Sequence, residues 1–418
     1  MSVIGKLSIP QLSGLFQTAF GDFETETAGW EHTKFIGAIE RDQDFVGNEL
    51  KLAQLIDYGG GQSSGSLPDS SVQTIYNPII LAKRVYSTAV IDNEAIAAAQ
   101  AAGRNKGAFM KATELSLLTL KGSFADQVVR QYFGNGTGTL GIVQSVVTNS
   151  PGDYTVTITA ASWIEAHWML KDLVNFAIGQ SQFLITEIDL TLRTIRVVRQ
   201  TGGDVPGIAN DIYKQKSRNN EMTGLKAIVD AVAGVDTLYG VPVGYRWNAS
   251  LIDAQGQAIS IKLLRQLDRK IRFNARILDG PASSDYIMSA IQFNIFEDSE
   301  EGKSITYIQP EKAPARQVGG EVAYAKVNGH LVRVSWSPFC PDDRVYAIDR
   351  RKVCLKLRPN QSSGAKDPGG FIFNGDSIFF PLQTSGTPQD AFQMFYKTYG
   401  ELYFNPVFVG GITGLATS

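Results

Sequence analysis

The stretch that decides the fold is residues 49–91, ELKLAQLIDYGGGQSSGSLPDSSVQTIYNPIILAKRVYSTAVI. Apolar and polar residues alternate in 49–58, which predicts a strand with one apolar face, and residues 72–91 return as a second extended segment. Between them, residues 59–71 are rich in glycine and serine, which is typical of a loop tip. A two-stranded hairpin is at best marginally stable alone in water. Because the rest of the chain offers no obvious partner, we expect copies of the same chain to cover this hairpin.

Two sets of residues are predicted to matter in this hairpin. Its candidate contacts with a neighbouring copy are Tyr58, Tyr76, Lys83, Arg84 and Tyr86. Its candidate hinge or loop tip consists of Gly59, Gly60, Gly61 and Gly65, and no Lys-Ser/Thr pair follows these glycines as a phosphate-binding loop requires.

Residues 1–48, which precede the hairpin, predict an extended arm without a core of its own. The arm carries scattered aromatic residues and several carboxylates, and a disordered tail is the alternative reading. A few buried aromatic side chains can supply much of the energy of a contact. The candidate anchors on a neighbouring copy are Phe16, Phe20, Phe23, Trp30 and Phe35.

The residues after the hairpin predict further elements in a mixed α+β order. Residues 92–141 hold a long helix, over about 107–133, whose apolar side chains recur at three- and four-residue spacing until Gly134. Residues 142–222 alternate in several short segments and predict an inserted β-rich domain. The remaining predicted segments are 223–254, 255–365 and 366–418.

An amphipathic helix is expected over 255–273, with a basic outer face. We expect its cations to be a candidate electrostatic surface, either for phosphate or for the acidic arm, although a solvated helix face is the ordinary alternative. The cations concerned are Lys262, Arg265, Arg269 and Arg272.

Composition limits the classes of function. A formal net charge of −2 argues against tight wrapping of nucleic acid, which usually needs a strongly basic protein. No apolar run is long enough to span a membrane, and no secretory signal is evident. Cys340 and Cys354 are expected to be reduced, and no spacing of His or Cys fits a metal site. We therefore expect no catalytic residue, no cofactor and no metal.

One motif favours an enzyme. Gly136, Gly138 and Gly141 match the dinucleotide-binding pattern G-x-G-x-x-G. That pattern binds a dinucleotide only where it follows a strand and opens a helix. Here it follows a predicted helix, so a glycine-rich helix end is the better interpretation, and a dinucleotide-dependent enzyme remains the alternative of another class.

Six segments in this order resemble the HK97-fold major capsid proteins of tailed double-stranded DNA bacteriophages. The segments are LPDSS (67–71), AKRVYSTAVIDNEAIAAA (82–99), RQYFGNGTGTLG (130–141), SDYIMSAIQFNIF (284–296), SPFCPDDRVYAIDRRKVCLKL (337–357) and GELYFNPVFVGGITGL (400–415). The resemblance implies an N-terminal arm, an extended hairpin called the E-loop, a spine helix, and peripheral and axial domains. The β-rich segment is then an added insertion domain, expected on the outer surface or at subunit contacts.

The resemblance also implies a function and partners. It predicts a structural protein that assembles through pentamers and hexamers into an icosahedral shell around double-stranded DNA, in the virion, after assembly in the host cytoplasm. The implied partners are copies of the chain, a portal, a decoration protein and DNA held by weak non-specific contact, with no membrane. An encapsulin-like compartment with an enzyme cargo is the nearest alternative.

Two features distinguish the chain from other members of that family. The hairpin begins near residue 49, which leaves no room for a long helical scaffolding segment, so a separate scaffolding protein or none is expected. Part of the family forms covalent Lys–Asn cross-links. Lys83 is a conceivable donor, but nothing in the sequence supports that reaction and none is expected.

Overall fold

The computed structural model describes residues 39–42, 45, 49–57, 74–92, 120, 122–176, 181–277, 280–299, 306–308, 322–357, 370–372, 380–384 and 387–417. The predicted arm anchors Phe16, Phe20, Phe23, Trp30 and Phe35 lie outside these ranges. So do Tyr58 and the glycines 59–61 and 65. Two compact units make up the chain: residues 1–46, 82–129 and 356–400 form one, and residues 47–81, 130–355 and 401–418 form the other.

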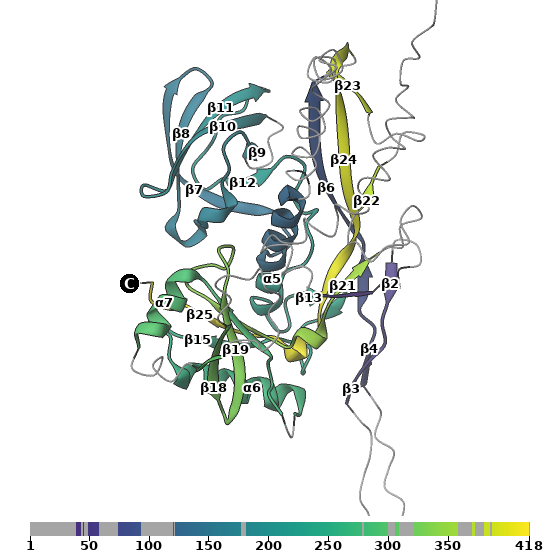
Figure 1. The fold of residues 1–418 in the computed structure, drawn as a ribbon, viewed down its shortest axis with the longest axis vertical. Helices are drawn as coiled ribbons and strands as arrows, with labels where there is room; N and C mark the ends of the chain where they lie inside the picture. The colour runs from purple at the N-terminus through teal and green to yellow at the C-terminus, as the bar shows by residue number, and fades with distance from the viewer. Residues whose placement is uncertain are drawn as a thin grey trace, which may run out of the picture. The chain divides into compact units, whose positions relative to one another are not determined.

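The sheet of the first unit is built on one long strand, β24 (Figure 1). β24 pairs antiparallel with β6 over ten residues, from Ala391 opposite Asp92 to Gly400 opposite Lys83. Within this unit Phe124, in the helical run 122–133, packs edge-on against Tyr396 with ring centroids 4.9 Å apart. The strands of the sheet are β1 (Glu40–Asp42), β6 (Lys83–Asp92), β21 (Val353–Leu357), β22 (Gly370–Phe371), β23 (Phe380–Thr384) and β24 (Thr387–Phe404).

Pairing of β6 with β24 corrects the expectation that all of residues 72–91 return along the hairpin. Residues 74–81 pair with the first strand segment of the hairpin, residues 49–57, whereas residues 83–92 pair with β24 near the end of the chain. The two paired strands lie about three hundred positions apart, and alternation in one segment does not reveal so distant a partner.

The β-rich segment of the second unit folds as a closed barrel with strand order β10-β11-β8-β7-β12-β9 (Figure 1). Alternate side chains point inward, as the alternating burial along β8 and β11 shows. The strands are β7 (Thr139–Ser150), β8 (Asp153–Ile158), β9 (Leu173–Phe176), β10 (Gln182–Asp189), β11 (Thr194–Thr201) and β12 (Asp211–Lys214), with 3-10 turns η1 (Ala160–Ser162) and η2 (Glu165–His167). The barrel thus has its own apolar core, including Val156, Ile195 and Val197.

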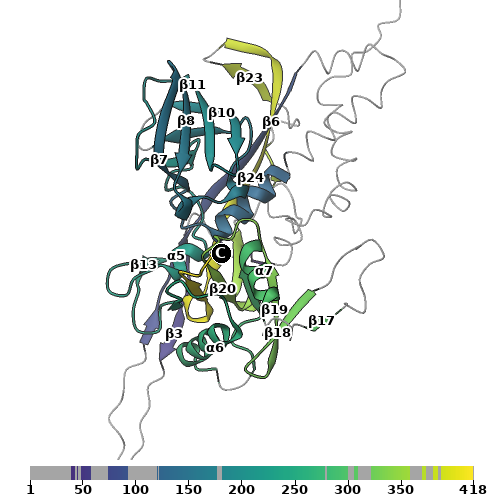
Figure 2. The ribbon, with the colours of Figure 1, turned by 90° about the vertical axis from the view of Figure 1, so that its left-hand side faces the viewer.

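A seven-stranded mixed sheet forms the other large part of this unit. Its order is β15-β25-β20-β16-β19-β18-β17, and α7 contacts β19 while α6 contacts β15, β25 and β18 (Figure 2). The strands are β15 (Ser250–Asp253), β16 (Asp285–Met288), β17 (Thr306–Ile308), β18 (Val322–Val327), β19 (His330–Trp336), β20 (Val345–Ile348) and β25 (Gly410–Thr413). The helices and 3-10 turns are α5 (Leu225–Val229), α6 (Ile261–Ala275), α7 (Ala290–Asp298), η4 (Arg350–Lys352) and η5 (Pro406–Phe408).

Three local sequence features explain a turn, a buried strand and the start of a helix. Asn328 and Gly329 both have positive φ, which a two-residue hairpin turn between β18 and β19 requires. β16 is buried at all four positions, as its apolar run predicts. The helix expected from residue 255 begins at Ile261, because the Ser260 side chain accepts a hydrogen bond from the Leu263 amide and so caps it there.

Candidate assembly surface

The described part of the hairpin is a two-stranded ribbon with two different faces. β2 (Glu49–Lys51) pairs with β5 (Ile79–Leu81), and β3 (Gln54–Asp57) pairs with β4 (Thr74–Tyr76). Because side chains alternate between the faces of a strand, Tyr76, Pro78 and Ile80 share the inner face, and the residues between them lie on the other.

The inner face is fastened to the second unit. Tyr76 packs edge-on against the fully buried Trp247, with ring centroids 6.0 Å apart. The Ile79 amide donates a 2.8 Å hydrogen bond to the Tyr239 carbonyl, and the Tyr403 hydroxyl donates a 2.9 Å bond to Gln54. These contacts fix the orientation of the hairpin root, so its other face is held in a defined position.

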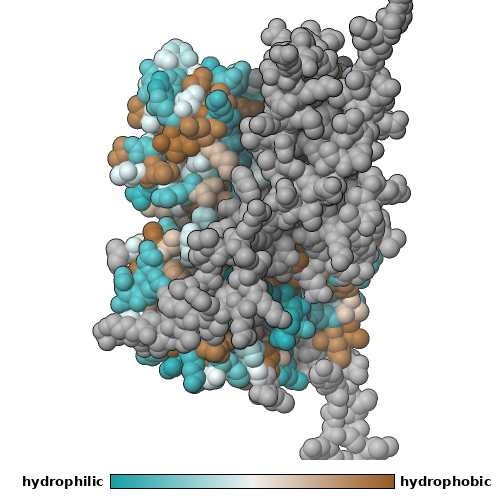
Figure 3. Space-filling model, in the orientation of Figure 1, coloured by the Kyte–Doolittle hydropathy of each residue, from teal (hydrophilic) through white to brown (hydrophobic). Residues whose placement is uncertain are grey.

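The outer face of the hairpin, defined by its exposed apolar residues Leu55, Ile75, Ile79 and Leu81, also carries the exposed charges Glu49 and Lys51. The exposed fractions of the four apolar side chains are 41%, 52%, 36% and 53%. Leu55 lies opposite Ile75, Ile79 opposite Lys51, and Leu81 opposite Glu49. A hydrophobic patch is visible over β3 and β4 (Figure 3). Clustered exposed apolar residues commonly mark an interaction site.

A second group of predicted contact residues lies on β6. Arg84 is exposed and its guanidinium lies 5.6 Å from the centre of the Tyr399 ring. Tyr86, 39% exposed, brings its hydroxyl within 3.4 Å of the Tyr399 hydroxyl, and Lys397 lies 4.9 Å from the same ring. Lys83 is half-buried at the end of the β6–β24 pairing.

The structure therefore sorts the predicted contact residues into two groups. Arg84 and Tyr86 lie together around Tyr399, whereas Tyr76 points toward its own chain. Sequence reasoning did not select the four residues of the outer face. The signal was present in the alternation of Ile75, Asn77, Ile79 and Leu81, but it does not reveal which face the chain itself covers.

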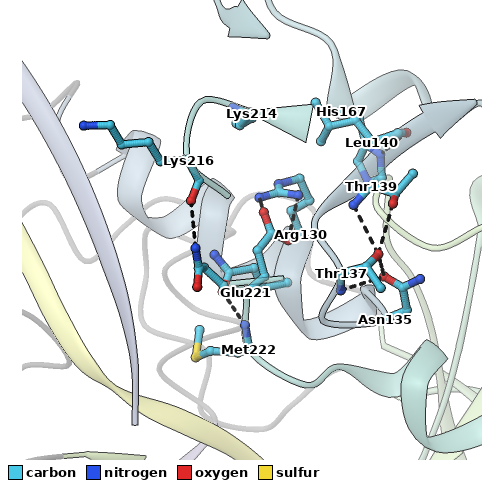
Figure 4. A network of polar contacts seen from close by, with 12 residues as sticks. Arg130, Asn135, Thr137, Thr139, Leu140, His167, Lys214, Lys216, Glu221 and Met222 are labelled. Carbon is cyan, nitrogen blue, oxygen red and sulfur yellow. Dashed lines mark hydrogen bonds and ion pairs between the residues drawn. The ribbon is translucent and has the colours of Figure 1, made fainter. Parts of the chain in front are cut away.

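The barrel joins its unit through a short neck, defined as residues 130–141 on the way out and 214–224 on the return. Arg130 forms a buried ion pair with Glu221, and one of its two hydrogen bonds is 3.0 Å long (Figure 4). The Asn219 amide donates a 2.8 Å hydrogen bond to the Thr137 carbonyl, so the outgoing and returning segments of the neck lie side by side. Neither Arg130 nor Glu221 was singled out in the sequence, since no local pattern pairs residues 91 positions apart.

The dinucleotide pattern belongs to this neck. Gly138 has φ of +81°, and a Cβ at that position would lie 2.8 Å from the Ser217 carbonyl oxygen. A Cβ at Gly141 would lie 3.0 Å from the Trp168 ring. Gly141 lies within β7, which runs into the barrel, and no helix opens at the motif. The motif therefore forms a packed helix end and strand start, and it lacks the strand–turn–helix context of the dinucleotide pattern.

The four cations of the predicted electrostatic face lie on α6, but not all on the same surface. Lys262, Arg265 and Arg269 are exposed. Arg272 instead turns toward Asp268, a side chain 2% exposed, with its Nε 2.8 Å from the carboxylate. Lys214, in the neck, likewise forms an ion pair, with Asp172 at 2.8 Å.

The remaining polar candidates are structural. Cys340 is a buried thiol and Cys354 is a half-buried thiol, and neither forms a disulfide bond. Within the ranges given above, no three His, Cys, Asp or Glu side chains are grouped as a metal site would need, and no helix is long and apolar enough to cross a membrane. Asp342 is half-buried, and burial raises its pKa above the usual value.

His167 of η2 is expected to make the stability of the folded chain sensitive to acid. Its Nδ1–H donates a 3.1 Å hydrogen bond to the Leu140 carbonyl, and burial, together with the nearby Arg130, lowers its pKa to about 3. Below the usual value near 6.5 the unfolded chain binds a proton that the folded chain excludes, so stability falls as pH drops from 6.5 toward 3. This term amounts to about 1.4 kcal/mol per pH unit.

Substitution isolates that term. In His167→Asn, an amide nitrogen takes the place of Nδ1 but carries no titrating group. We expect the free energy of unfolding of this variant to fall less steeply between pH 6.5 and 4 than that of the wild type, by one proton. Denaturant titrations at several pH values measure the difference, and equal slopes would contradict the assignment.

No protein-family model matches the sequence, and no curated protein matches it. Among solved structures, the chain is similar to the capsid asymmetric unit of cyanophage A-1(L), with TM-score 0.48, 11% identity and 92% of each chain covered. It is also similar to the capsid of a native GTA particle (TM-score 0.45, 7% identity, 93% of this chain and 91% of that one). A third similar structure is the encapsulin complex of Synechococcus elongatus (TM-score 0.45, 8% identity, 93% and 89%).

The described parts follow one another as the resemblance predicts. A hairpin precedes a helix, a barrel is inserted after that helix, and the chain closes with β24 in the sheet of the first unit and β25 in the seven-stranded sheet. The fold is therefore of the α+β class, with the order of parts that the resemblance to HK97-fold capsid proteins implies.

Proposed function

We propose that this chain is the major capsid protein of a tailed bacteriophage, which assembles through pentamers and hexamers into an icosahedral shell around double-stranded DNA. The observation that carries the proposal is the outer face of the hairpin. Its apolar residues are exposed, yet the opposite face is fixed by Trp247 and Tyr239. A ribbon whose inner face is held by its own chain and whose outer face is exposed is suited to packing against a neighbouring copy.

Main-chain geometry supports this use of the hairpin. Among the described strands, β2 and β5 pair only with each other, and so do β3 and β4. Ribbons of two strands need an additional surface for stability, and unprotected strand edges tend to associate with other chains. In a closed shell each copy would cover the hairpin of the next copy. Such a contact is heterologous, because two different surfaces meet, and it generates a closed ring when the rotation between copies closes.

The proposal includes further partners that follow from the resemblance to capsid proteins. A portal, a decoration protein and a separate scaffolding protein are expected in the virion of such a phage, and DNA would be held by weak, non-specific contact. The exposed groups on β6, Arg84 and Tyr86, are proposed as further contacts between copies. We propose no Lys–Asn cross-link at Lys83, and subunits that separate on denaturing gels would agree.

An encapsulin-like compartment is the second candidate, because a similar shell fold encloses protein cargo there. The two candidates differ in the contents of the particle. Nucleic acid recovered from nuclease-treated shells formed in the natural host favours the capsid, whereas a packaged enzyme favours the compartment.

Assembly is tested by negative-stain electron microscopy of the purified full-length chain over a concentration series. Closed shells or rings of five or six subunits are the expected result, because exposed apolar ribbons drive association as concentration rises. Particles no larger than a monomer at every concentration, also in the presence of a co-expressed scaffolding protein, would overturn the proposal.

A further inference from the structure

One exposed side of α6 carries cations along its whole length. Residues 262, 265, 269 and 273 recur at three- and four-residue steps, so they lie on one stripe of the helix, and Arg276 follows as its C-cap residue. The α6 stripe is defined as Lys262, Arg265, Arg269, Phe273 and Arg276, and all five side chains are exposed. At 1.5 Å per residue its helical part is about 16 Å long.

The charge of the stripe is unbalanced. Residues 261–276 contain six lysines and arginines and a single carboxylate, although the whole chain has a net charge of −2. That carboxylate, Asp268, is buried and already bonded to Arg272 and to the Asn328 amide. Among the residues that the structure describes, no carboxylate pairs with Lys262, Arg265 or Arg269.

The helix holds these cations on a rigid support. Leu264, Leu267 and Ile271 are fully buried on the opposite side and pack in the core of the seven-stranded sheet. Asn328, in the β18–β19 turn, donates hydrogen bonds to Asp268 at 2.7 Å and to the Arg265 carbonyl at 3.3 Å. The cations therefore project from a fixed backbone, and binding need not order the chain first.

We infer that the α6 stripe binds the phosphate backbone of the packaged double-stranded DNA. This inference rests on the proposed function, and it assigns the inward-facing surface of the subunit to α6. Double-stranded DNA presents a charge about every 1.7 Å of its axis, so a row of three or four cations meets phosphates whatever the base sequence. Such contacts are individually weak and independent of sequence, as a genome container requires.

A protein partner fits the stripe less well. The cores of protein interfaces are depleted of charged residues, whereas four of the five residues of the stripe are cations and Phe273, 83% exposed, is its one apolar member. Protein–DNA interfaces are much more positive than protein–protein interfaces. A contact with the acidic segment of a second copy is the rival occupant, and the experiment below separates the two.

The test uses the unassembled full-length chain and a fluorescent 30-base-pair duplex, with anisotropy measured over a salt series. In the variant Lys262→Gln/Arg265→Gln/Arg269→Gln, the slope of log K against log salt is expected to decrease by about 2.7. Affinity at low salt should fall by roughly tenfold or more. A charge-preserving variant, Lys262→Arg/Arg265→Lys/Arg269→Lys, should retain both the slope and most of the affinity.

The matched control, Lys171→Gln/Arg193→Gln/Lys216→Gln, removes three cations from the barrel and its neck, and these side chains are also exposed. This control is expected to leave the slope within about one unit of the wild type. Circular dichroism of each variant shows whether it is folded, and the charge-preserving variant shows whether charge itself is responsible.

Three results would overturn the inference. They are no binding by the wild-type chain, equal slopes for the α6 variant and the wild type, or an equal loss in the barrel control. A variant that binds DNA normally but fails to form shells would assign the stripe to a second copy instead. Microscopy of the wild type tests shell assembly separately from DNA binding. If shells form although the α6 stripe does not bind DNA, this inference fails and the proposed function remains supported.

Discussion

The double substitution Ile79→Lys/Leu81→Lys is expected to abolish shell formation at every concentration at which the wild type assembles. Both side chains lie on the outer face of the hairpin, 36% and 53% exposed in the single chain. Placing an ammonium group where a neighbour packs requires burying a charge, which costs several kcal/mol at position 79, where Lys51 lies opposite. At position 81 Glu49 lies opposite and offsets part of that cost. A shell repeats that contact in every subunit, so even a small cost per copy prevents closure.

The subunit itself should survive this change. Ile80, between the two positions, is fully buried on the inner face and is left unaltered. The variant is expected to keep the wild-type circular dichroism spectrum and a similar melting temperature as an unassembled chain. A matched control, Ile79→Val/Leu81→Met, keeps the face apolar and should still assemble. Normal shells from the lysine variant in electron micrographs would rule out the hairpin as an intersubunit contact.

The largest loss of subunit stability is expected from Arg130→Met. Arg130 and Glu221 are 6% and 5% exposed and form one buried ion pair in the neck. Removing the cation leaves a buried carboxylate without its partner, which typically costs about 3–5 kcal/mol. Chemical denaturation of the unassembled chain, compared with wild type at pH 7, measures this loss.

A second substitution separates the pair from its surroundings. In Arg130→Met/Glu221→Leu no buried charge remains, so the double variant is expected to recover most of the lost stability. The Arg130 Nε already lacks a hydrogen-bond partner in the described structure, so the pair itself is imperfectly satisfied. As a surface control, Arg196→Met removes the partly exposed pair with Asp153 and should have a much smaller effect. Equal losses in the two single variants would contradict the role of burial.

Local patterns were enough to predict the elements whose partners are close in sequence. The β18–β19 hairpin follows from Asn328-Gly329, and the buried β16 follows from its run of apolar residues. The amphipathic period gave α6, although its start was placed too early because the cap is Ser260. In each case the pattern and the structure depend on the same few neighbouring residues.

Long-range contacts could not be predicted in this way. Nothing near β6 indicates that its partner is β24, and nothing near Arg130 indicates Glu221. Closure of the barrel through β9 and β12 depends on short strands with weak alternation. The candidate assembly surface was located only approximately for the same reason. The sequence indicated a hairpin that needs cover, but which face the chain already covers depends on Trp247, far away in sequence.

The neck has a practical consequence for building new particles. Its outgoing and returning strands lie within one hydrogen bond of each other, Asn219 to Thr137, and the barrel has a separate apolar core. A polypeptide whose two ends meet can be exchanged for another of that kind with little change in loop-closure entropy. Residues 140–213 could thus be replaced by a foreign domain with adjacent termini, which would then be displayed once per subunit. Such a graft keeps the buried Arg130–Glu221 pair, because both residues lie outside the exchanged segment.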